Sequence, residues 1–81
     1  MSLLPENQVT HHIVKPVMLV DEASSTEYYI GVSRNTSNQS NPTWRIQKIW
    51  KIGTIWNFGY PEGKQDFKYV WDDRHSYTYI Q

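Results

Sequence analysis

The sequence predicts an all-β fold: a small antiparallel sheet, barrel or sandwich of four or five strands, with one short helical turn near residues 66–73. Apolar and polar residues alternate with a period of two along several short segments, which is typical of half-buried strands. Turn-forming residues separate these segments. Aromatic residues make up 15% of the 81 residues, with four Trp and six Tyr, so aromatic side chains must supply much of the core.

The composition restricts the class of protein. Lys and Arg together number eight, as do Asp and Glu, so the net charge is zero with neutral histidines. Nucleic-acid binders usually carry a basic excess, so we expect no nucleic-acid partner. The chain has no cysteine, which excludes disulfides and thiolate metal sites. A single domain of this size has a thin stability margin, which favours association with other proteins or with its own copies.

The chain divides into an arm and a domain. Residues 1–8 are polar and contain Pro5, so we expect a flexible N-terminal arm followed by a single β domain over residues 9–81. The first residues lack the basic region and apolar run of a secretory signal. No window approaches the roughly 20 apolar residues of a membrane span. We therefore expect synthesis in a cytoplasm and no membrane partner.

The first half of the domain predicts two strands. Residues 9–20 are rich in β-branched side chains and contain Pro16, which cannot donate to a sheet ladder, so they form an edge strand or an extended arm. Residues 21–25 carry the short polar side chains of a turn. Residues 26–33 alternate strictly and predict a half-buried strand. Its two sides carry Thr26, Tyr28, Ile30 and Val32, and Glu27, Tyr29 and Gly31.

The densest apolar pattern lies in residues 43–60, which predict a hairpin that turns near Gly53. A two-residue turn would put Trp44, Ile46 and Trp50 opposite Ile55, Asn57 and Gly59. A three-residue turn would place Gly53 in the left-handed conformation of a bulged turn. We prefer the three-residue turn because it separates apolar from polar side chains better. One face would then carry Trp44, Ile46, Lys48, Trp50, Thr54, Trp56, Phe58 and Tyr60.

The C-terminal segment predicts a helical turn and a last strand. Phe67, Val70 and Trp71 have the i, i+3 and i+4 spacing of one side of a helix, and Asp66 is placed to cap it. We expect this turn to pack Trp71 onto the sheet. An alternation in the same residues leaves a strand as the alternative. Residues 75–80 alternate again and predict the last strand.

Candidate catalytic and metal sites are few. His11 and His12 are adjacent on a strand-like segment and would point to opposite faces, so they cannot chelate one metal together. Residues 72–75, Asp-Asp-Arg-His, would suit a divalent cation or an acid–base pair. The simpler interpretation is the end of a helical turn, with Arg74 pairing with a carboxylate. No nucleophile motif or phosphate loop is recognisable, so we expect no enzyme, metal or cofactor.

The hairpin is the strongest candidate for a binding surface. The candidate interface residues are Trp50, Trp56, Phe58, Tyr60 and Arg45. Aromatic residues and arginine are enriched at the hot spots of protein interfaces. Aromatic rings also stack on sugars, so a glycan platform of Trp50, Trp56 and Tyr60 is the alternative. Trp44 and Trp71 are expected in the core.

An ordered series of blocks runs through most of the chain. The blocks are Asp21-Glu22-Ala23-Ser24, Tyr29-Ile30-Gly31, Trp44-Arg45-Ile46-Gln47-Lys48-Ile49, a hairpin with a glycine, and Trp71-Asp72-Asp73-Arg74. The series, over about residues 21–79, resembles a family of small tailed-bacteriophage proteins with the outline D-E-A-S, Y-I-G, W-x-I-x-x-I, a glycine turn and W-D-x-R. The chain departs from that outline near Trp50 and Trp56, where the family has polar residues.

The resemblance implies a non-catalytic virion structural protein, made in the host cytoplasm and then assembled into the particle. The implied partners are other virion proteins or further copies of the chain, as a homo-oligomer. A receptor- or glycan-binding module of the particle is the alternative, and an intracellular regulator that contacts a host protein is a third. The resemblance carries no catalytic residues.

Overall fold

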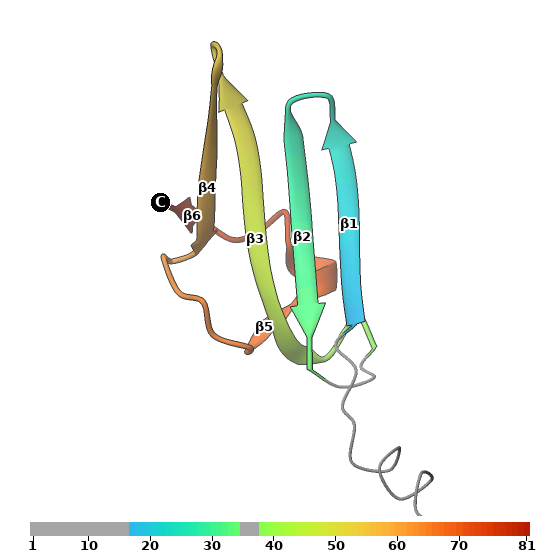
Figure 1. Cartoon of the computed structure of the whole chain (residues 1–81). Helices are drawn as coiled ribbons and strands as arrows, with labels where there is room; N and C mark the ends of the chain where they lie inside the picture. The colour runs from blue at the N-terminus through green and yellow to red at the C-terminus, as the bar shows by residue number, and fades with distance from the viewer. Residues whose placement is uncertain (1–16, 35–37) are drawn as a thin grey trace, which may run out of the picture.

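The computed structural model describes residues 17–34 and 38–81. Its regular structure is an antiparallel sheet of six strands with one 3-10 turn (Figure 1). The elements are β1 (Val17–Ser24), β2 (Glu27–Ser33), β3 (Pro42–Ile52), β4 (Ile55–Pro61), β5 (Tyr69–Val70), η1 (Trp71–Asp73) and β6 (Tyr79–Ile80). The predicted all-β antiparallel fold with one short helical turn is confirmed, with six strands in place of four or five.

Part of the prediction for the N-terminus falls outside the described residues. This applies to the arm over residues 1–8, to His11 and His12, and to residues 9–16 of the first predicted strand. The rest of that strand, from Val17 onward, is β1, which lies at one edge of the sheet as predicted.

The strand β3 holds the sheet together. The four long strands follow one another in the order β1-β2-β3-β4, and β6 pairs with the end of β4. The eleven residues of β3 pair with β2 on one side. On its other side, the C-terminal half pairs with β4 and the N-terminal end with β5. Consequently the chain after β4 returns to the start of β3.

The hairpin between β3 and β4 has a two-residue turn at residues 53–54. Ile52 pairs with Ile55, and Trp50 pairs with Asn57. Gly53 has a φ of +63°, as at the first central position of a type II′ turn, whose twist matches that of the flanking strands. The preferred three-residue register is therefore wrong. The predicted face that joined Trp44 to Phe58 does not form, because the two residues lie on opposite faces.

Four local predictions are also corrected. Residues 21–24, expected in a turn, extend β1, because pairs such as Asp21 with Tyr29 satisfy their backbone groups in the ladder. Phe67, Val70 and Trp71 do not form one side of a helix, because Tyr69 and Val70 form the strand β5. Within β5, Tyr69 pairs with Trp44 of β3.

The helical turn itself is η1, and it begins only at Trp71. It has no side-chain cap, so Asp66 does not cap it. The last strand is limited to Tyr79–Ile80, because Ser76 N–H and Oγ both donate to the Asp73 carbonyl oxygen, at 2.8 and 2.6 Å, and prolong the turn.

The segment from β5 to β6 covers one face of the sheet, which we call the inner face (Figure 1). The buried core consists of Tyr29, Trp44, Ile46, Tyr69 and Trp71, with Val17, Leu19, Tyr77 and Tyr79 packed against it. The predicted core positions of Trp44 and Trp71 are confirmed, and their ring centroids lie 6.0 Å apart. Trp71 packs directly over Gly31, where an added Cβ would lie 2.4 Å from a ring carbon.

An ion pair ties the covering segment to β1. Arg74 Nε donates to Asp21 Oδ2 at 2.9 Å, and Arg74 Nη1 donates to the Trp71 carbonyl oxygen at 3.0 Å. The guanidinium also lies 4.5 Å from the Trp71 ring centroid. Arg74 thus pairs with a carboxylate, as the simpler interpretation expected. That carboxylate belongs to Asp21, which lies 53 residues earlier in the sequence.

The charged side chain of Lys48 lies among aromatic rings of the inner face. Lys48 Nζ is 3.1 Å from Glu27 Oε2. It also lies 5.7, 5.5 and 5.9 Å from the ring centroids of Tyr29, Trp50 and Tyr79. The carboxylate and the negative faces of the rings compensate the partial loss of water around this ammonium group.

Burial raises the pKa of three tyrosines on this face. Desolvation of the phenol is the largest cause at Tyr29, Tyr69 and Tyr79. The neighbouring phenols of Tyr29 and Tyr77 raise the pKa of Tyr79 further. The folded protein therefore holds these phenolic protons to a higher pH than the unfolded chain, whose tyrosines titrate near pH 10.

We expect the stability of the protein to fall as the pH rises above about 10. Between the pKa of the unfolded chain and the higher pKa of the folded state, the folded protein binds more protons, so raising the pH favours unfolding. Urea unfolding at pH values from about 8 to 12 measures this loss. Tyr79→Phe should make the decline shallower, whereas an equally steep decline in that variant would contradict the assignment.

Candidate protein-binding face

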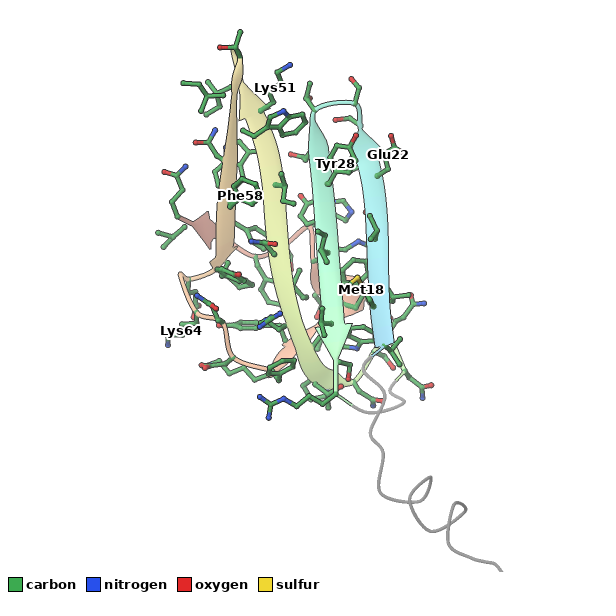
Figure 2. The ribbon with its side chains drawn as sticks, viewed as in Figure 1. Met18, Glu22, Tyr28, Lys51, Phe58 and Lys64 are labelled. Carbon is green, nitrogen blue, oxygen red and sulfur yellow. The ribbon has the colours of Figure 1, made fainter. Side chains whose placement is uncertain are left out.

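The face of the sheet opposite the inner face, here called the outer face, has an apolar surface (Figure 2). It carries Met18 and Val20 from β1, Tyr28, Ile30 and Val32 from β2, Ile49 from β3, and Trp56, Phe58 and Tyr60 from β4. The strand registers align these side chains in rows. Tyr28, Ile49 and Phe58 form one row, and Val20 and Ile30 lie in the next.

Large apolar side chains of the outer face are open to solvent. The exposed fraction is 66% for Met18, 61% for Val20, 53% for Phe58 and 40% for Trp56. Four strands about 4.8 Å apart, over about six residues of about 3.4 Å each, give a flat area of roughly 400 Å². The apolar side chains share this area with Arg45 and Gln47 of β3, and an apolar patch of a few hundred Å² is often an interaction site.

Local contacts hold the aromatic rings of the outer face in place. Tyr28 and Trp56 meet edge to face with 5.9 Å between ring centroids. Lys51 Nζ lies 5.6 Å from the Trp56 ring centroid, and Gln47 Nε2 donates to Tyr60 Oη at 3.3 Å. Since strands and neighbours already restrict these rings, a partner would immobilise them at low entropic cost.

Charged groups stand around the apolar area. Glu22 on β1 and Lys51 on β3 lie towards the same end of the sheet (Figure 2). Neither forms an ion pair with another described residue. Near the other end, the guanidinium of Arg45 lies 5.2 Å from the Phe67 ring centroid, and Arg34 lies 4.2 Å from the same centroid.

The structure brings together four of the five predicted interface residues. Trp56, Phe58, Tyr60 and Arg45 belong to the outer face. Trp50 does not, since it lies on the inner face, where its ring packs against Gly59. The expected glycan platform of Trp50, Trp56 and Tyr60 is therefore split between two faces.

Sequence reasoning missed the aliphatic half of the outer face. Met18, Val20, Ile30 and Val32 were not among the predicted interface residues. A signal was present, because residues 17–20 are apolar at every position, which is typical of a strand with apolar side chains on both faces.

The residues 72–75, considered for cation binding or acid–base chemistry, serve the fold. Arg74 holds Asp21, and His75 Nε2 lies 3.3 Å from the same carboxylate oxygen. The His75 ring also meets Tyr29 edge to face. Across residues 17–34 and 38–81, no group of three His, Asp or Glu side chains is placed to hold a metal ion.

Comparison of the chain with protein-family models, curated proteins and solved structures finds no match. The part of the chain that the structure describes contains no helix that is both long enough and apolar enough to cross a membrane. Function is therefore inferred from the outer face.

Proposed function

We propose that this protein is a non-catalytic assembly module that binds another folded protein through its outer face. The observation that carries the proposal is the asymmetry of the sheet. The chain's own C-terminal segment buries the central part of the inner face, and Ile52 and Ile55 at the hairpin end of that face stay exposed. On the outer face, Met18, Val20 and Phe58 are each more than half exposed. A second folded surface would complete the missing layer of the domain.

The chemistry of the outer face suits a protein partner. Burying one large apolar side chain contributes about 1.5–3 kcal/mol, and aromatic residues dominate interface hot spots. The face also lies on strands, so its side chains keep a fixed spacing. Such a surface acts by shape complementarity and needs no catalytic group.

The sequence resemblance supplies the biological setting of the proposal. The blocks from Asp21 to Arg74 resemble small proteins of tailed bacteriophages, and the first and last blocks are joined here by the ion pair between these two residues. The module would be made in the host cytoplasm and built into a virion. Its partners would be other virion proteins or further copies of the chain.

Purified particles from a host that produces this protein test the proposal. Mass spectrometry should detect the protein, and Phe58→Asp should lower its incorporation at least about tenfold, the loss expected from one hot spot. Gln65→Asp, in an exposed loop, is the matched control and should incorporate normally. Normal incorporation of folded Phe58→Asp would overturn the role of the outer face, and absence of the wild-type protein would overturn the virion setting.

A further inference from the structure

We propose that the partner of the outer face is an acidic protein surface, whose carboxylates bind Arg34 and Arg45 beside an apolar patch. This inference rests on the proposed function, because it gives the chemistry of the partner that the same face would bind. The observation that carries it is a pair of arginines that meet at one end of the outer face without a described carboxylate. Acidic groups of the partner would complete this arrangement.

The two arginines gather on one aromatic ring. The guanidinium carbons of Arg34 and Arg45 lie 4.2 and 5.2 Å from the ring centroid of Phe67. The ring attracts both cations and holds the two long side chains together. Neither guanidinium forms an ion pair with a carboxylate of residues 17–34 and 38–81, and Asp66, next to Phe67 in the sequence, lies 3.9 Å from Lys68 Nζ instead. Two like charges therefore stand together, an arrangement that a carboxylate of another molecule would stabilise.

The contrast with Arg74 shows what the two arginines lack. Arg74 donates to the Asp21 carboxylate and to the Trp71 carbonyl oxygen, so its charge and its N–H groups are used within the fold. The guanidinium groups of Arg34 and Arg45 contact the Phe67 ring and donate no hydrogen bond to another described residue. A guanidinium has five N–H donors in a planar fork that matches a carboxylate, and the resulting hydrogen bonds are roughly twice as strong as neutral ones. Aspartate and glutamate side chains are therefore the groups that suit this pair.

The arginines border apolar side chains of the outer face directly. In one row across the sheet, Met18 pairs with Val32, and Val32 pairs with Arg45. A protein partner with an apolar patch and carboxylates at one end would cover Met18 and Val32 while its acidic groups reach the arginines. The apolar contacts would supply most of the affinity, and the charged contacts would fix the orientation of the partner.

The charge balance of the outer face favours an acidic partner over a second copy of the chain. The charged residues at outward positions of the four long strands are Arg45, Lys51 and Glu22, and Arg34 adds a further cation. Three cations against one carboxylate leave this face positive, although the whole chain has a net charge of zero. Two such faces would repel each other, whereas an acidic surface is attracted.

Selection of peptides on the full chain tests the chemistry of the partner. A displayed library of random peptides, each about 16 residues long, is selected on the immobilised wild type, and the best binder is synthesised with a fluorescent label as the probe. We expect peptides in which acidic residues stand beside aromatic and aliphatic ones. Fluorescence anisotropy should show that Arg45→Gln weakens binding about tenfold, the loss of one charge-assisted contact. Lys64→Gln, in an exposed loop, is the matched control and should stay within about twofold of the wild type.

The contrary results separate this inference from the proposed function. Selected peptides that lack acidic residues, or that bind folded Arg45→Gln as tightly as the wild type, would overturn the acidic partner. The proposed function would still stand if Phe58→Asp abolishes the binding of those peptides. Binding that folded Phe58→Asp does not weaken, or a library that yields no binder, would overturn both.

Two further results would assign the outer face to a different occupant. In sedimentation equilibrium, a wild-type dimer that Phe58→Asp converts to a folded monomer would assign the face to a second copy. Peptide binding that appears only after deletion of residues 1–16 would assign the face to that segment of the chain. Either result would overturn the acidic partner.

Discussion

Replacement of Trp44 by alanine is expected to abolish cooperative folding at 37 °C. The side chain is fully buried, its ring packs near Trp71, and Nε1 donates to the Asn38 carbonyl oxygen at 3.0 Å. Truncation of a buried tryptophan costs about 3–5 kcal/mol. Domains are stable by only about 0.05–0.15 kcal/mol per residue, so a chain of 81 residues loses much of its stability. Far-ultraviolet circular dichroism during heating measures the loss.

The matched control is Trp56→Ala, which removes the same side chain from the outer face. Trp56 is 40% exposed, so we expect a loss below about 1 kcal/mol in dilute solution. The comparison is made at the lowest practical concentration, so that association through the outer face contributes little to the stability. Equal losses in the two variants would contradict the placement of Trp44 and Trp56 on opposite faces.

Gly31→Ala is expected to destabilise the protein by about 2–3 kcal/mol, although alanine normally favours a strand over glycine. The new Cβ would lie 2.4 and 2.6 Å from two carbons of the Trp71 ring. The ring cannot withdraw freely, because it packs near Trp44 and beneath the guanidinium of Arg74. Urea unfolding measures the difference in the free energy of unfolding.

A double-mutant cycle isolates the steric cause of this loss. Trp71→Leu destabilises the core by itself but makes room above Gly31. In that background, Gly31→Ala should cost close to nothing. Additive costs in the double variant would show that the loss arises from something other than the contact between Gly31 and Trp71.

Local periodicity predicted the class of fold because successive side chains of a strand point to opposite faces, so a half-buried strand alternates apolar and polar residues. The strict alternation of residues 26–33 corresponds to β2, and Tyr29 and Gly31 share its inner side. The core positions of Trp44 and Trp71 followed from the need of a small chain with few aliphatic residues to bury its largest side chains.

The hairpin register could not be read in the same way. The criterion was separation of apolar from polar side chains, which assumes that one face is buried and the other is solvated. Here both faces are apolar, and charged Lys48 lies on the inner face beside Glu27. The turn geometry at Gly53, a local property, determined the register instead.

Long-range contacts account for the other differences. Asp21 and Arg74 are 53 residues apart, and no local pattern indicates that they meet. Similarly, Tyr69 joins a strand because Trp44 offers a free ladder position, which overrides the helical spacing around it. The apolar run over residues 17–20 indicated apolar side chains on both faces, but the full set of outer-face residues depends on the hairpin register.

The segment that covers the inner face follows β4 in the chain, so it is synthesised after the four long strands. The ribosome produces β1 to β4 before it produces Tyr69, Trp71 and Tyr79. During that interval the nascent sheet has apolar side chains on both faces and no second layer, a state that is prone to aggregate. The domain therefore completes its core only when residues 69–79 have left the exit tunnel, and chaperones that bind exposed apolar strands would have their main opportunity before then.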